Sequence, residues 1–397
     1  MTRRRTRFLL WVLIAAALLV LFAPQLRVAY LTALLLLEIP TPEADGPIAA
    51  RLPDPVVERV AFEAAGRRVV ADVYRPAGAG SASDADSGGG SHPGIVLNHG
   101  VATGGMNDLR LVNFADALAR CGYVALVPEF VNLKEFRVRP SDVDEVVASV
   151  EYLAGLPDVN PGRVGLFGFS YAGGLAVLAA SDPAVRDNVR FVFALGSYYD
   201  LRSIVAYATT GYFLEDGEWV YMEPRHTGKW AFMRNMLELV GDADDRALLA
   251  RIANAKLEDE GVDVAAEVAA LGEEGVALYE LMTNTDPERS GKLIDRLNDD
   301  ILAYFDTLSL PGNIDEARAH LILAHGRDDN LMPYTESVLL AENAPPGSTV
   351  ELRILESFQH VDLALDWSGG PRAWASTFAE VGRVYSVAHA LLAQGLL

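Results

Sequence analysis

Short apolar runs alternate with amphipathic stretches along most of the chain after residue 55. The runs are bounded by turn-forming residues, which is typical of buried strands, and the stretches between them repeat apolar residues at helical spacing. Strands separated in this way indicate a parallel sheet with helices on both faces. The pattern predicts strands over 56–62, 68–74, 94–98, 123–127, 163–167, 191–195, 321–324 and 350–355, and helices over 109–120, 142–154, 171–181, 335–342 and 372–392.

The alternation is interrupted once, between about Tyr198 and His320. Residues 200–315 are rich in Ala, Leu, Asp and Glu and are predicted to be helical. Because sheet-forming runs resume after them, we expect a helical cap inserted into one large domain. The predicted organisation is a membrane anchor over residues 1–40, a first part of the sheet domain over 50–197, the cap over 198–318 and a second part of the sheet domain over 319–397.

The first 40 residues have a different pattern. Four arginines within residues 3–7 precede an apolar run that ends at Ala23, and no charge follows until Arg27. Such a run can span about 30 Å of hydrocarbon as a helix, with the arginine side in the cytoplasm and the rest of the chain outside. Pro24 is a poor residue for signal cleavage, so we expect an uncleaved single-pass anchor. A cleaved signal peptide, which would give a secreted protein, and a core helix are the alternatives.

A second apolar stretch, Val28–Leu37, is too short to cross a membrane by itself. It would extend the anchor, lie at the membrane interface or pack on the folded domain.

Composition excludes several classes of protein. With 51% hydrophobic and 22% charged residues the chain can form a large core, so global disorder is excluded. A net charge of −21, most of it in residues 200–315, argues against a nucleic-acid partner, because a phosphate backbone requires a basic surface. The single cysteine, Cys121, excludes an intramolecular disulfide and a thiolate-rich metal site. We expect no metal and no organic cofactor.

The central chemical signal is the segment Gly168-Phe169-Ser170-Tyr171-Ala172-Gly173-Gly174. A predicted strand ends just before Ser170 and a predicted helix begins directly after it. This is the arrangement of a nucleophile elbow, in which small neighbours allow a tight strand-to-helix turn. The serine is thereby exposed at the start of a helix, whose free N–H groups favour a developing negative charge.

A serine nucleophile requires a base that an acid keeps in position. In this arrangement the acid follows a later strand and the histidine follows the last strand. Asp329 follows the strand predicted over 321–324, and His360 follows the strand over 350–355. We therefore predict His360 as the general base and Asp329 as the acid; Asp328 and Asp200 are the alternative acids.

The oxyanion of the tetrahedral intermediate requires two N–H donors. One is expected from Tyr171, directly after the nucleophile. The other is expected from the glycine-rich loop His99–Gly105, and Val101 is the predicted donor because it follows the His-Gly turn.

The sequence resembles the α/β-hydrolase superfamily, most closely its dienelactone hydrolase-like serine hydrolases, at His99-Gly100, Gly168–Gly174, His325-Gly326-x-x-Asp329-x-x-x-Pro333 and His360. The resemblance implies a mostly parallel, doubly wound sheet, a Ser170–Asp329–His360 triad and hydrolysis through an acyl-enzyme. Dienelactone hydrolases have cysteine at the position of Ser170 and lack a helical insert of this size. The expected function is therefore a membrane-tethered serine hydrolase of carboxylic esters, with a small-molecule ester as substrate. A peptidase or amidase with the same triad, and a non-catalytic binding protein of the same fold, are the alternatives.

Overall fold

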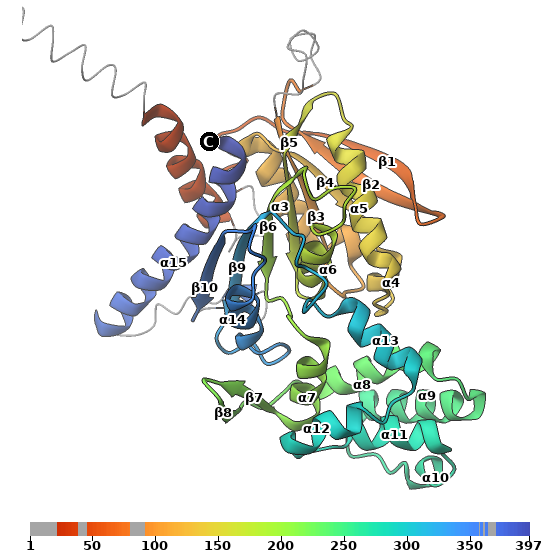
Figure 1. Cartoon of the computed structure of the whole chain (residues 1–397). Coiled ribbons are helices and arrows are strands. Elements are labelled where there is room, and N and C mark those ends of the chain that lie inside the picture. Colours follow the sequence, from red (N-terminus) through yellow and green to blue (C-terminus); the bar gives the residue numbers. More distant parts are fainter. Residues whose placement is uncertain (1–21, 39–45, 80–91, 357, 360–361, 364–370) are drawn as a thin grey trace, which may run out of the picture.

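The computed structural model describes residues 22–38, 46–79, 92–356, 358–359, 362–363 and 371–397. Its centre is an eight-stranded sheet with flanking helices (Figure 1). In spatial order the strands are β1 (Val56–Ala64), β2 (Arg67–Arg75), β4 (Val124–Pro128), β3 (His92–Asn98), β5 (Val159–Phe169), β6 (Val189–Leu195), β9 (His320–Gly326) and β10 (Val350–Leu355). The β1–β2 and β2–β4 pairs are antiparallel and the other pairs are parallel. This architecture confirms the predicted α/β-hydrolase fold.

Alternate residues of the strands enter two separate hydrophobic clusters, because successive side chains of a strand point to opposite faces. Val96 and Leu166 belong to the first cluster, which the helices α5 (Ser141–Ala154) and α6 (Tyr171–Ala179) complete. Leu97 and Phe167 belong to the second cluster, on the face covered by α3 (Leu109–Cys121) and α15 (Pro371–Leu396). Cys121 is buried in the second cluster, where desolvation raises the pKa of its thiol to about 12 and keeps it unreactive.

A helix over residues 22–38 also covers the second face. Its residues Val28, Leu31 and Leu35 recur at helical spacing and are buried in the second cluster. The hydroxyl of Tyr385 in α15 donates a hydrogen bond of 3.2 Å to the Ala29 carbonyl, which ties the two helices together. The stretch Val28–Leu37 therefore packs on the folded domain.

The opposite side of this helix is exposed and apolar; it carries Phe22, Leu26, Tyr30 and Leu37. Among the helices that the structure describes, none is long and apolar enough to cross a membrane. The predicted spanning run, residues 8–23, lies almost wholly outside the described residues.

Between β6 and β9 the chain forms a separate group of helices below the sheet in Figure 1. Its elements are α7 (Leu201–Thr210), β7 (Tyr212–Glu215), β8 (Glu218–Tyr221), α8 (His226–Met236), η2 (Leu237–Leu239), α9 (Ala243–Glu258), α10 (Ala265–Val268), α11 (Glu273–Met282), α12 (Pro287–Ile294) and α13 (Asp299–Leu308). We refer to residues 201–308 as the cap.

The expectation of an entirely helical insert is wrong for residues 212–221, which form the β7–β8 hairpin. Its turn consists of Asp216 and Gly217, both with positive φ, at 51° and 84°. An Asp-Gly pair between short apolar runs is a strong hairpin signal, and it was present in the sequence.

The two ends of the cap lie side by side and are fastened to the sheet domain. The Leu310 amide donates to the Tyr199 carbonyl at 2.8 Å, and the Ser309 hydroxyl donates to the Asp200 carboxylate at 2.8 Å. The buried carboxylate of Glu336, in α14 (Thr335–Glu342), accepts hydrogen bonds from the amides of Tyr199 and Asp200 at 2.8 and 3.0 Å. A buried carboxylate at the cap entrance thus holds the cap at a defined position.

Candidate active site

Ser170 lies in the turn between β5 and α6, with φ 55° and ψ −129°. Gly168 makes this turn possible, because a Cβ atom at that position would lie 2.3 Å from the Ala172 carbonyl oxygen. The Ser170 amide donates a hydrogen bond of 2.8 Å to the Leu195 carbonyl at the end of β6. A strained, left-handed backbone conformation at a non-glycine residue persists only where its surroundings impose it, and it is common at functional sites. The turn has the geometry that a nucleophile elbow requires.

The glycine-rich loop after β3 passes beside this turn. A Cβ atom on Gly100 would lie 3.6 Å from the Ser170 Cβ atom, so the loop and the serine are immediate neighbours. Val101, Tyr171 and Ser170 line the same cavity. Tyr171 is the first residue of α6, where an N–H group has no acceptor within the helix. The Val101 amide donates no hydrogen bond to any residue that the structure describes.

Two polar contacts join this loop to the segment after β4. The Phe130 amide donates to His99 Nε2 at 3.0 Å, while His99 Nδ1 donates to the Gly100 carbonyl at 2.8 Å. Burial lowers the pKa of the His99 imidazole, so the ring remains the neutral acceptor that the Phe130 amide requires. The Met106 amide donates to the Glu129 carboxylate at 2.7 Å. The sequence marked His99-Gly100 as a motif but gave no signal for Glu129.

Asp329 is fully buried in the loop after β9. One of its carboxylate oxygens accepts the amides of Leu331 and Met332 at 2.9 and 3.1 Å, which fixes the orientation of the carboxylate. Of the two alternative acids, Asp328 is exposed, and Asp200 caps α7 and bonds to Ser309 at the cap entrance.

A second histidine supports the Asp329 loop. His325 Nε2 lies 3.0 Å from the Met332 carbonyl oxygen and 3.3 Å from Asp329 Oδ2. Because a carbonyl only accepts, Nε2 carries a proton that it donates to Met332, while Nδ1 lies 2.7 Å from the Ser337 hydroxyl oxygen. The ring thus directs an N–H group toward the loop that carries Asp329. The sequence placed His325 and Asp329 in one motif, and the structure adds the contacts of His325 with Met332 and Ser337.

His360 lies outside the described residues. Two short antiparallel strands, β11 (Phe358–Gln359) and β12 (Asp362–Leu363), flank it, and β11 lies against β9. The assignment of His360 as general base therefore remains a prediction.

A cavity of about 770 Å³ opens beside Ser170. Its lining includes Val101, Phe169 and Leu331 near the serine, and is mostly apolar. The aromatic residues that cluster between the end of β6 and the end of β8 do not line it: Tyr198, Tyr199, Tyr207, Tyr212, Phe213, Trp219 and Tyr221. Within the described part of the chain, no group of three His, Cys, Asp or Glu side chains is placed to hold a metal ion.

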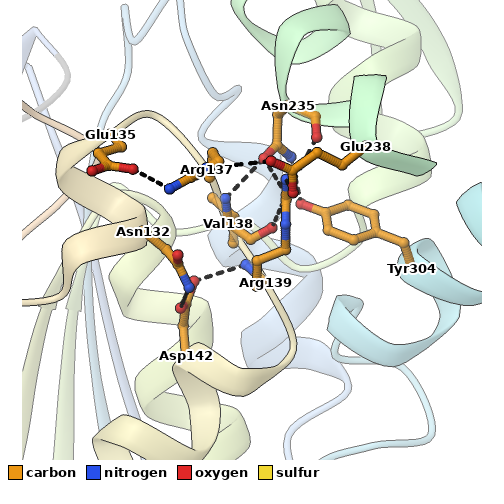
Figure 2. Close-up of polar contacts among 9 residues, drawn as sticks. All are labelled: Asn132, Glu135, Arg137, Val138, Arg139, Asp142, Asn235, Glu238 and Tyr304. Atoms are coloured by element: carbon orange, nitrogen blue, oxygen red, sulfur yellow. Dashed lines mark hydrogen bonds and ion pairs between the residues drawn. The ribbon is translucent and has the colours of Figure 1, made fainter. Parts of the chain in front are cut away.

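A polar network joins the cap to the sheet domain at the cavity wall (Figure 2). The buried side chain of Asn235 accepts from the Val138 amide at 2.8 Å and from the Arg139 guanidinium at 2.7 Å, and it donates to the Tyr304 hydroxyl at 2.9 Å. Arg139 also pairs with Glu238 at 2.8 Å and lowers the pKa of that carboxyl. Because Val138 and Asn235 both line the cavity, this contact determines the position of its cap-side wall.

The sequence matches the family described as X-Pro dipeptidyl-peptidase (S15 family) over residues 65–354, well over half of the chain. Among curated proteins, no sequence matches. Solved structures with a similar fold include 2,6-dihydroxy-pseudo-oxynicotine hydrolase, with 14% identity, a TM-score of 0.45, and coverage of 84% of this chain and 69% of that one. Another is the acylaminoacyl peptidase of Pyrococcus horikoshii, with 14% identity, a TM-score of 0.46 and coverage of 80% and 40%, so the chain spans less than half of that peptidase. A third is Est1E from Butyrivibrio proteoclasticus, with 14% identity, a TM-score of 0.42 and coverage of 85% and 98%.

The support of Asp329 by His325 can be tested by substitution. His325→Ala removes the N–H group that bonds to the Met332 carbonyl and lies 3.3 Å from Asp329, so kcat for hydrolysis of a chromogenic substrate should fall about ten- to a hundredfold. His325→Gln, which keeps a side-chain N–H donor, should recover part of the loss. Steady-state kinetics with a soluble chromogenic substrate measures both.

If His325 only stabilises the fold, His325→Ala should leave the pH dependence of kcat/KM unchanged. If Asp329 loses its alignment, it stabilises a protonated base less, so the acid limb of kcat/KM should move to lower pH. His320→Gln, at the opposite end of β9, is the matched control and should keep the wild-type profile. An unchanged profile in a folded His325→Ala protein would contradict the positioning role.

Proposed function

The chain belongs to the X-Pro dipeptidyl-peptidase (S15) family and is a serine hydrolase of the α/β-hydrolase superfamily; from that premise we propose that it cleaves carboxylic esters through an acyl-enzyme on Ser170. The proposal takes Ser170 as nucleophile, His360 as base and Asp329 as the acid that orients His360. The strained turn at Ser170, beside the loop of Val101, supports these roles.

In the proposed reaction, the Ser170 oxygen attacks the ester carbonyl carbon while His360 accepts the hydroxyl proton. The amides of Val101 and Tyr171 donate hydrogen bonds to the resulting oxyanion. As the carbon–oxygen bond to the alcohol breaks, His360 returns the proton to the leaving alcohol. Water then attacks the acyl-enzyme by the same route, which releases the acid and restores Ser170.

The apolar lining of the cavity is the observation that favours esters. Release of a dipeptide from a free N-terminus requires a group that binds an ammonium, which in a desolvated site must be a carboxylate. Among the described lining residues, Glu38 and Asp108 carry carboxylates. Glu38 accepts the Ile48 amide at 3.0 Å, and Asp108 pairs with Arg110 at 2.9 Å. The cavity is therefore suited to uncharged substituents.

A dipeptidyl-peptidase that releases X-Pro dipeptides is the second candidate, and the family match favours it. Both candidates use the same nucleophile and differ in what the cavity must bind.

A fluorophosphonate probe tests the nucleophile. The wild-type protein should be labelled on the peptide that contains Ser170, because the probe reacts with an activated serine. Ser170→Ala should not be labelled, whereas Ser91→Ala, which alters the other Gly-x-Ser of the chain, should be labelled as the wild type is. Mass spectrometry locates the label, and a folded wild-type protein that resists the probe would exclude this mechanism.

A substrate panel separates the two candidates. We expect kcat/KM for p-nitrophenyl butyrate to exceed that for Ala-Pro-p-nitroanilide by about tenfold or more, because the two carboxylates in the described lining of the cavity already bond to the Ile48 amide and to Arg110. Release of nitrophenol and nitroaniline is followed by absorbance, with Ser170→Ala as the blank. Preference for the anilide, lost when its N-terminus is acetylated, would establish the peptidase instead.

We also propose that the chain is tethered to a membrane by residues 8–23, with the hydrolase domain on the outer side. The apolar run after four arginines and the exposed apolar side of helix 22–38 support this.

The full chain should pellet with membranes and require detergent for release, whereas a chain beginning at residue 22 should be released without it. Added protease should reach the domain only from the outer side. A full chain that stays in the supernatant would refute the tether, and a mature mass lacking these residues would indicate secretion.

A further inference from the structure

The cavity beside Ser170 continues past the serine to the opposite face of the sheet. On the cap side its walls include Val138, Val205 and Leu331, which belong to or pack on the first hydrophobic cluster. Its lining also includes Phe193 and Ala324, which belong to the second cluster. Because the two clusters lie on opposite faces, the cavity passes around the carboxyl-terminal edge of the sheet, where β5 ends at Ser170.

We call the part of the cavity on the second face the sheet-face arm, and helices enclose it. Its apolar lining consists of Phe167, Phe193, Leu195, Ala324 and Leu355 of the strands, Leu111, Phe114 and Ala117 of α3, Val384, Val387, Ala388 and Leu391 of α15, and Leu35 of helix 22–38. All of these side chains are apolar, and all but Phe114 are buried. Glu38, on the same helix as Leu35, and Asn113 of α3 also line the cavity, and the Glu38 carboxylate accepts the Ile48 amide. A cavity lined mostly by apolar groups holds water poorly, and an alkyl chain suits it.

We propose that the sheet-face arm binds the acyl chain of a long-chain ester, so that the substrates are esters of long fatty acids; this rests on the proposed ester hydrolysis at Ser170. The arm begins next to the nucleophile, where the carbonyl carbon must lie, and it continues away from the cap. The acyl chain then occupies the second face, and the alcohol occupies the cap side of the cavity. Transfer of each methylene from water into such an arm should raise kcat/KM about two- to fourfold until the arm is full.

The position of the arm agrees with this ligand. Its outer wall includes Leu35, and the helix that carries this residue begins where the predicted membrane-spanning run ends. A chain of methylenes can lie along α15 and helix 22–38, because both present aliphatic side chains to the arm. The polar pair Asp108–Arg110 also lines the cavity, at the start of α3. Its two charges compensate each other, because the side chains lie 2.9 Å apart.

A substitution within the arm tests the proposal. Ala388→Phe adds a ring to the arm from α15 and should lower the ratio of kcat/KM for p-nitrophenyl palmitate to that for the acetate by about tenfold or more. Ala390→Phe is the matched control: it changes an equally buried alanine of the same helix, 8% exposed against 7%, that does not line the cavity. Its ratio should stay within about twofold of the wild type. Ala117→Leu, on the α3 wall, is a second variant in case Ala388→Phe does not fold.

The outcomes separate this proposal from the proposed function. A wild-type enzyme that hydrolyses acetate, with a ratio that falls for Ala388→Phe or Ala117→Leu and not for Ala390→Phe, supports the arm. A ratio unchanged in both folded arm variants overturns it and leaves ester hydrolysis intact. A ratio that falls equally in the control also overturns it. If the wild type hydrolyses neither ester, ester hydrolysis itself is refuted.

Discussion

The close approach of β5 and α6 around Ser170 constrains every other part of the site. It requires Gly168 to lack a side chain, and it places Ser170 at φ 55°, which costs about 1 to 3 kcal/mol unless the surroundings compensate. Burial of α6 between the sheet and the cap provides this compensation: Gly174 lies against the ring of Tyr198, and the Tyr198 hydroxyl bonds to the Leu308 carbonyl at 2.8 Å. The serine is therefore held at the carboxyl-terminal edge of the sheet, and the remaining groups must reach it there.

Each segment that reaches this edge is held by its own buried polar contact. The loop of Val101 is joined to the segment after β4 through His99 and Glu129, the Asp329 loop is supported by His325, and the cap entrance is bound by Glu336. These contacts do not share partners, so the loss of one leaves a buried group unsatisfied without releasing the others. The sheet edge determines where Ser170 and the neighbouring loops lie, whereas the cap and the second face determine the shape of the cavity.

The two ends of the described chain cover the same face of the sheet. Helix 22–38 and α15 pack on each other through Tyr385 and Ala29, and together they close the sheet-face arm. The segment predicted to enter the membrane thus continues directly into a wall of the cavity. This places the proposed tether and the proposed acyl chain on one side of the molecule and the acidic cap on the other.

By itself the sequence determined the order of strands and helices and the tight turn at Ser170, because both follow from local patterns: alternating apolar runs and the small residues around Ser170. The β7–β8 hairpin was also encoded locally, by Asp216 and Gly217, although the helical composition around it concealed it. The contact of Glu129 with Met106 and the extension of the cavity to the second face were decided by the tertiary structure alone. Each joins residues or surfaces whose proximity depends on how the sheet folds, and a sequence pattern carries no information about such contacts until the chain has packed.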